Sequence, residues 1–114
     1  MARIYLSTDQ IARSGARRWA TADIYQHPRE VVGLKQGDWL VIDFDHVLFD
    51  AKDEAVALMI QAARQGVRVG VHTYSDGDPR LHPVLALPGV VVGKRQKDVL
   101  IALYRQARQQ RQAA

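Results

Sequence analysis

Three aspartates follow one apolar segment of this chain, in the stretch from Asp38 to Asp50 that reads DWLVIDFDHVLFD. The apolar residues before Asp43 predict a buried strand, and Asp45 and Asp50 follow shortly after it. A strand of a parallel sheet that ends in carboxylates delivers them to the carboxyl edge of the sheet, where such folds gather ligands and phosphates. We therefore expect the chemistry of the chain at that edge.

Four polar residues fall at or just after the ends of predicted strands: Asp9, Asp43, Thr73 and Lys94. In acyl-phosphate chemistry a carboxylate attacks phosphorus, while a divalent cation, a hydroxyl and an ammonium stabilise the three equatorial oxygens. Asp43, Asp45, Thr73 and Lys94 are therefore the candidate catalytic residues. Mg²⁺, bound weakly, is the expected cofactor, and Asp9, Asp43 and Asp45 are its candidate ligands. The four histidines show no metal-ligand spacing and are given no role.

Strand-like and helix-like periodicities alternate along the chain with short gaps. The predicted strands cover residues 3–7, 21–26, 39–43, 67–73 and 90–92. The predicted helices follow Asp9, run from Pro28 to near Gly37, and cover residues 52–65 and 97–112, while residues 79–87 are expected to form a proline-bounded helix or turn. This order predicts an α/β three-layer sandwich with a five-stranded, mostly parallel sheet, covered on both faces by right-handed crossovers. The residues expected in the core are Leu6, Val41, Ile42, Leu58, Val69, Val71, Val91 and Leu103.

The composition predicts one globular domain over residues 1–114, because 47% of the residues are apolar and the length suits a single core. The absence of cysteine excludes disulfides and thiolate metal sites, and agrees with a reducing compartment. The longest apolar runs are only strand-sized, and the amino terminus lacks an apolar run of secretory type. We expect a soluble cytoplasmic protein without membrane contact.

The pattern of strand-end residues resembles the receiver domain of two-component response regulators, over essentially the whole chain. In that family the phosphoacceptor aspartate closes the third strand, as Asp43 does. The Thr or Ser of the fourth strand matches Thr73, 30 residues later, and the lysine after the fifth matches Lys94, after a further 21. Asp50 stands where the family usually places an Asp-Gly pair. The resemblance implies a flavodoxin-like fold and a role in signal transduction, with protein-protein contacts and a phosphorelay.

The chain also departs from the receiver pattern. Receivers usually carry two adjacent acids after the first strand, whereas here only Asp9 follows Ser7 and Thr8. Ala51 replaces the usual glycine, and Arg95 stands where the family prefers proline. The loss of one carboxylate predicts weak Mg²⁺ binding, because this cation relies on a few well-placed oxygen ligands. The chain therefore resembles a divergent receiver, or pseudo-receiver, and the phosphorylation of Asp43 is left open.

Two other families share parts of the pattern. VIDFDHVLFD resembles the first motif of haloacid-dehalogenase-type phosphatases, which implies Asp43 as nucleophile and Asp45 as general acid. Thr73 or Ser75 would match the second motif of that family, and Lys94 or Lys97 the third, but its later acidic motif has no counterpart.

The third resemblance is to Toprim domains, enzyme domains that act on nucleic acid. These domains place a DxD after a strand, as Asp43 and Asp45 are placed, and the segment from Asp76 to Pro79 could follow the next strand. Their earlier catalytic glutamate is missing here.

Charge is unevenly distributed along the chain, which carries a formal net charge of +4. Arginines gather at residues 13–18 and from residue 94 onward, whereas acids crowd around residues 38–54. The receiver resemblance implies that the face from Pro79 to Gln112 contacts a protein partner or a second copy of the chain. The basic last helix, with Arg105, Arg108 and Arg111, could instead bind nucleic acid or simply face solvent.

Overall fold

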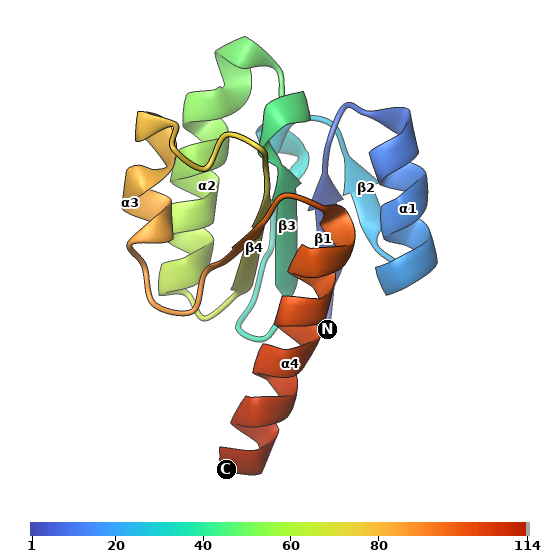
Figure 1. Cartoon of the computed structure of the whole chain (residues 1–114), viewed down its shortest axis with the longest axis vertical. Helices are drawn as coiled ribbons and strands as arrows, with labels where there is room; N and C mark the ends of the chain where they lie inside the picture. Colours follow the sequence, from blue (N-terminus) through green and yellow to red (C-terminus); the bar gives the residue numbers. More distant parts are fainter. Residues whose placement is uncertain (114) are drawn as a thin grey trace.

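The computed structural model describes residues 1–113 and contains a five-stranded sheet with helices on both faces (Figure 1). The strands are β1 (Arg3–Leu6), β2 (Asp23–Tyr25), β3 (Trp39–Asp43), β4 (Arg68–His72) and β5 (Val91–Gly93). Neighbouring strands are all parallel, in the order β2-β1-β3-β4-β5. The predicted α/β three-layer sandwich with a flavodoxin-like sheet is therefore confirmed.

Four α-helices lie within the described residues, two on each face of the sheet (Figure 1). They are α1 (Gln10–Ala20), α2 (Lys52–Arg64), α3 (His82–Leu85) and α4 (Gln96–Ala113). The core has two parts, one on each face of the sheet, because successive side chains of a strand such as β3 point to opposite faces. Leu40 and Ile42 pack with α2 and α3, whereas Trp39 and Val41 pack with α1 and α4.

Local signals explain where the helices begin and end. The carboxylate of Asp9 accepts a hydrogen bond from the amide of Ala12, as expected of an N-cap at the start of α1. The helix α2 has acidic residues in its first turn, which favours the positive end of the helix dipole. It is followed by Gly66 with a φ of 83°, a left-handed conformation that glycine adopts without strain.

The predicted helix from Pro28 to near Gly37 is wrong, because only a 3₁₀ turn over Pro28–Glu30 forms there. The side chain of His27 accepts a hydrogen bond from the amide of Arg29, and the side chain of Glu30 accepts one from the amide of His27. The following residues 31–35 have no regular secondary structure: Val31 is buried, its neighbour Val32 is exposed, and Gly33 has a left-handed φ of 74°. The crossover from β2 to β3 is therefore made without an α-helix.

Six of the eight residues expected in the core are buried, and the other two, Leu58 and Val91, are partly buried. Val91 lies on the edge strand β5, which has a neighbouring strand on one side only. Leu58 lies on α2 and packs on the rim of the core. Both residues nevertheless contact the core clusters on their side of the sheet.

Helix α4 extends well beyond the edge of the sheet (Figure 1). Its buried residues, Val99, Leu100 and Leu103, belong to its first half. No residue after Leu103 whose side chain is described is fully buried, although Ala107 is partly buried and packs against the core. None of the helices within residues 1–113 combines the length and apolarity that a membrane crossing requires.

Candidate functional site at the carboxyl edge of the sheet

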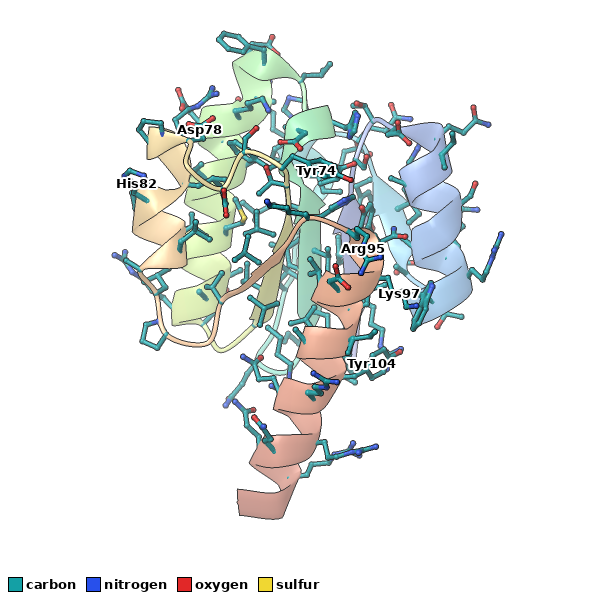
Figure 2. The ribbon with its side chains drawn as sticks, viewed as in Figure 1. Tyr74, Asp78, His82, Arg95, Lys97 and Tyr104 are labelled. Atoms are coloured by element: carbon teal, nitrogen blue, oxygen red, sulfur yellow. The ribbon has the colours of Figure 1, made fainter. Side chains whose placement is uncertain are left out.

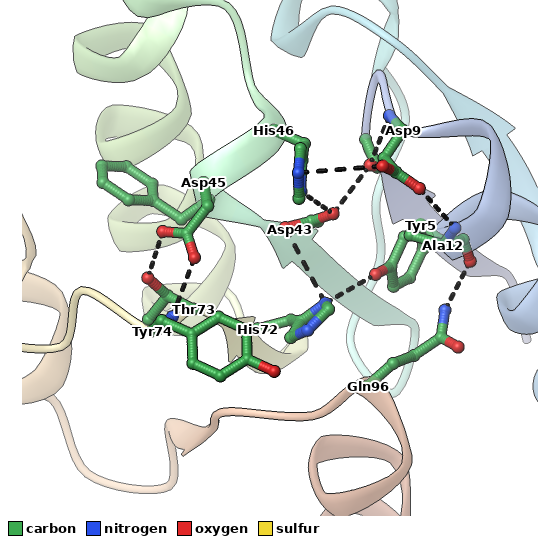
Figure 3. A network of polar contacts seen from close by, with 12 residues as sticks. Tyr5, Asp9, Ala12, Asp43, Asp45, His46, His72, Thr73, Tyr74 and Gln96 are labelled. Carbon is green, nitrogen blue, oxygen red and sulfur yellow. Dashed lines mark hydrogen bonds and ion pairs between the residues drawn. The ribbon is translucent and has the colours of Figure 1, made fainter.

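The predicted site residues lie at the ends of β3 and β4 or in the segments that follow β1, β3, β4 and β5. Figure 3 shows Asp43 and Asp45 turned in different directions: Asp43 lies toward His46, and Asp45 lies toward Thr73 and Tyr74. The two carboxylates therefore belong to two separate sets of contacts.

Asp43 is the buried acid of the site, with a side chain only 1% exposed. Its Oδ2 atom accepts a hydrogen bond from the hydroxyl of Ser7 at 2.9 Å and lies 2.8 Å from Nδ1 of His46. Ser7 is itself fully buried. A carboxylate withdrawn from water in this way is held by charge-assisted hydrogen bonds, which are stronger than neutral ones.

His46 connects Asp43 to Asp9. Because a carboxylate only accepts, Nδ1 of His46 donates to Asp43, and Nε2 lies 3.7 Å from Oδ2 of Asp9. The amide of Ala12 donates to Asp9 and is the leading reason why the pKa of Asp9 is lowered, and the charge of His46 acts in the same direction. When the ring carries both protons, it is a positive charge between two carboxylates.

On the other side of Asp43 lies His72. Its Nδ1 is 3.8 Å from Oδ1 of Asp43 and 3.0 Å from the hydroxyl of Tyr5. Burial, followed by the charge of Asp43, raises the pKa of Tyr5, so that its phenol stays protonated. We call these five residues, Tyr5, Ser7, Asp43, His46 and His72, the Asp43 network.

Asp45 is held by donors from the end of β4. The hydroxyl of Thr73 donates to its Oδ1 at 2.6 Å, and the amide of Tyr74 donates to its Oδ2 at 2.8 Å. Burial alone would raise the pKa of Asp45, but these two hydrogen bonds and the charge of Lys52 together lower it. The buried hydroxyl of Thr73 also accepts from the amide of Ser75, so it both donates and accepts within the protein.

The cation beside Asp45 is Lys52, the first residue of α2, and not the lysine expected from the sequence. Nζ of Lys52 donates to the carbonyl of Phe44 at 2.6 Å and lies 4.3 Å from the centre of its ring. Burial lowers the pKa of Lys52, although the charge of Asp45 opposes this shift. Lys94 follows β5 and is exposed, and within residues 1–113 it forms no ion pair with the aspartates.

The strand register separates Asp43 from Thr73, two residues that the sequence spacing predicted to lie in one site. Asp43 pairs with His72 across β3 and β4, so these two side chains lie on the same face of the sheet. Thr73 is the next residue and points to the opposite face. Both Asp43 and Thr73 are buried, and they therefore do not line an open cleft.

The carboxylates do not fit Mg²⁺ in this arrangement. A divalent cation needs carboxylate oxygens with free lone pairs directed at one point. Here the oxygens of Asp45 accept from Thr73 and Tyr74, and Oδ2 of Asp43 accepts from protein donors as well. Within residues 1–113, no three carboxylate or imidazole groups gather closely enough to hold a metal ion. The structure thus does not bring Asp9, Asp43 and Asp45 together as a ligand set.

The residues that sequence reasoning missed are Tyr5, Ser7, His46, His72 and Lys52. Ser7 and His72 could have been found from strand parity, because each lies at the end of a strand beside β3. His46 carried a weaker signal, its position three residues after Asp43. The sequence spacing that indicated Thr73 and Lys94 does not show which residues lie opposite each other on neighbouring strands.

Comparisons with protein-family models, with curated proteins and with solved structures give no match for this chain. The fold and the polar contacts described above are therefore the grounds on which a function can be argued.

Proposed function

We propose that this chain is a receiver-like regulatory module that acts by binding a protein surface, and that Asp43 does not accept a phosphoryl group. Two features support the first part: the sheet order β2-β1-β3-β4-β5, and an aspartate that closes its middle strand. The resemblance to receivers in the spacing of Asp43, Thr73 and Lys94 points in the same direction.

The single observation that carries the second part is the burial of Asp43. A carboxylate that attacks phosphorus must present an oxygen in line with the leaving group. Only 1% of the Asp43 side chain is exposed, and Ser7 and His46 hold its Oδ2 atom. Releasing that oxygen would break two hydrogen bonds to a charged group, each contributing about 1.5–3 kcal/mol.

The stabilising groups of phosphoryl transfer are also differently arranged. Thr73 donates to Asp45 rather than toward Asp43, and Lys94 is exposed without an acidic partner among residues 1–113. His46 lies between Asp9 and Asp43, near the position where a receiver would hold its metal. The imidazole of His46 donates a hydrogen bond to Asp43, so that no metal ion is needed to stabilise the carboxylate.

The face from Pro79 to Gln112 is the proposed contact surface, with a second copy of the chain as the simplest partner. It contains the edge strand β5, whose outer side has no neighbouring strand, and Val92, which is 44% exposed. Unpaired edges and exposed apolar side chains favour association. Tyr104 is already used within the fold, because it packs edge-to-face on Trp39 at 4.8 Å. The side chain of Gln112 lies outside the described part of the chain.

Sedimentation at several concentrations tests this surface. We expect concentration-dependent self-association that Val92→Ser weakens. Val32→Ser is the matched control, because Val32 is 83% exposed and lies outside the proposed face. A monomer at all concentrations, or equal effects of the two variants, would contradict the contact surface.

Incubation with acetyl phosphate and Mg²⁺, read by intact mass, tests the chemical part of the proposal. We expect no phosphoryl adduct. An adduct that Asp43→Asn abolishes would favour a working receiver. Turnover of p-nitrophenyl phosphate that Asp43→Asn and Asp45→Asn abolish would favour a phosphatase of the haloacid-dehalogenase type.

A further inference from the structure

Positive charge is concentrated in one of the two helical layers. Helix α1 contributes Arg13, Arg17 and Arg18 and no acid, while α4 contributes Lys97 and three arginines against the single acid Asp98. The two helices together carry a formal charge of +6, which exceeds the +4 of the whole chain. Helix α2 on the opposite face has two basic and two acidic residues, and α3 has no Lys, Arg, Asp or Glu.

The two basic helices lie side by side on the same face of the sheet (Figure 1). Near the start of α4, Gln96 donates to the carbonyl of Ala12 at 2.6 Å. Further along α4, the hydroxyl of Tyr104 lies 3.4 Å from the carbonyl oxygen of Trp19 in α1. Figure 2 shows Tyr104 beside the ribbon of α4. The arginines of α1 and α4 therefore belong to one continuous layer, which we call the basic layer.

The arginines of the basic layer form no ion pairs within residues 1–113, although the charge of Arg13 contributes to lowering the pKa of Asp9. In the opposite layer, Arg29 pairs with Glu54 at 2.7 Å and Arg80 pairs with Asp78 at 2.9 Å. Within the described residues, none of the six arginines of α1 and α4 lies within ion-pair distance of a carboxylate. A net positive charge over a whole layer attracts polyanions and increases the rate of encounter with them.

The shape of the basic layer also suits a chain of phosphates. One hollow of about 280 Å³ is lined by Ile101, Tyr104, Arg105, Arg108 and Arg111. A second hollow, of about 260 Å³, is lined by residues of α1 that include Arg13 and Arg17. Because the second half of α4 projects beyond the sheet, its arginines can be approached from more than one side (Figure 1).

We propose that the basic layer formed by α1 and α4 binds nucleic acid through its phosphate backbone, without sequence preference. The charge complementarity between the unpaired arginines and regularly spaced phosphates is the reason for choosing this partner. The proposal extends the contact expected of the last helix to α1. It does not depend on whether Asp43 accepts a phosphoryl group, because none of the Asp43 network belongs to the two helices.

Fluorescence anisotropy with a labelled DNA duplex of about 20 base pairs tests the proposal. Non-specific binding of this kind has a dissociation constant of about 10⁻⁴–10⁻⁶ M at physiological salt. The logarithm of the affinity should fall with the logarithm of salt concentration, with a slope of about −0.9 per phosphate contacted. Two duplexes of unrelated sequence should bind equally.

The decisive variant replaces Arg105, Arg108 and Arg111 with Gln. All three are exposed, so we expect the fold to persist, the affinity at low salt to fall at least about tenfold, and the salt slope to become shallower by about 3. The matched control is Arg29→Gln, Lys35→Gln and Arg64→Gln, which changes the net charge equally outside the basic layer. If the α4 variant loses helicity by circular dichroism, Arg17→Gln with Arg18→Gln tests the same layer through α1.

Three outcomes would overturn the proposal. The first is an absence of duplex binding by the wild type at low salt. The second is an equal loss of affinity in the control and in the arginine variants. The third is tighter binding to vesicles of phosphatidylcholine and phosphatidylglycerol than to the duplex at matched phosphate concentration, which would identify an anionic membrane surface as the partner.

Discussion

Asp43 and His72 lie directly opposite each other across β3 and β4, and Nδ1 of His72 is 3.8 Å from Oδ1 of Asp43. This pairing places a histidine, rather than the threonine that follows it, beside the buried carboxylate. With Ser7 and His46 on the other oxygen, Asp43 is surrounded by groups of the protein itself.

Removing the carboxylate of Asp43 should destabilise the protein. Asp43→Ala leaves the buried hydroxyl of Ser7 without its acceptor, and an unsatisfied buried group costs about 1–3 kcal/mol. Urea unfolding measures the change. Asp50→Ala is the control, because Asp50 is exposed, and it should change the free energy of unfolding by less than about 0.5 kcal/mol. Equal stability of the two variants would contradict the Asp43 network.

Gly70 provides a test of the packing of β4 against α4. A methyl group at Gly70 would lie 2.5 Å from Cγ1 of Val99 and 3.2 Å from Cδ1 of Leu103. Gly70→Ala should therefore lower the free energy of unfolding by about 1–3 kcal/mol, because the stiff valine cannot move aside easily. Gly77→Ala is the matched control, since no heavy atom lies within 4 Å of its added carbon. An unchanged unfolding midpoint for Gly70→Ala would refute this packing.

The sequence was sufficient to predict the parallel sheet and four of the five helices, because apolar strands alternate with helical patterns along most of the chain, but it wrongly predicted a helix after Pro28. It could not define the site, because the partners of Asp43 depend on strand register. Ser7 and His72 are ordinary strand-end residues until β1 and β4 are placed beside β3. Lys52 is likewise unremarkable until the turn after β3 brings it to the carbonyl of Phe44.

Acidification should weaken the fold through Asp45. Its pKa is lower in the folded protein than in the unfolded chain, so its contribution to stability is complete above the unfolded value, about 3.9, and is lost as pH falls through the folded value. Thr73→Val removes one hydrogen bond and should bring the pKa of Asp45 closer to its ordinary value. Carboxyl shifts measured by NMR between pH 6 and pH 2 follow this titration. A pKa of Asp45 that does not change in Thr73→Val would contradict the contact.

Replacing Tyr5 should affect His72 specifically. Tyr5→Phe keeps the packing of the ring and removes the hydroxyl that lies 3.0 Å from Nδ1 of His72. We expect the imidazole signals of His72 to shift in NMR spectra, while those of His27, which lies outside the Asp43 network, stay in place. Unchanged signals of His72 would show that the hydroxyl and the imidazole do not interact in solution.

We propose that Asp43 is a structural acid, held by the protein and closed to phosphoryl groups and metal ions. Its most direct test is an NMR titration with Mg²⁺ to tens of millimolar, followed by beryllofluoride, which mimics a phosphoryl group on a carboxylate. We expect the signals of Ser7, His46, His72 and Thr73 to remain unchanged throughout. Saturable shifts at these residues that disappear in Asp43→Asn would contradict it.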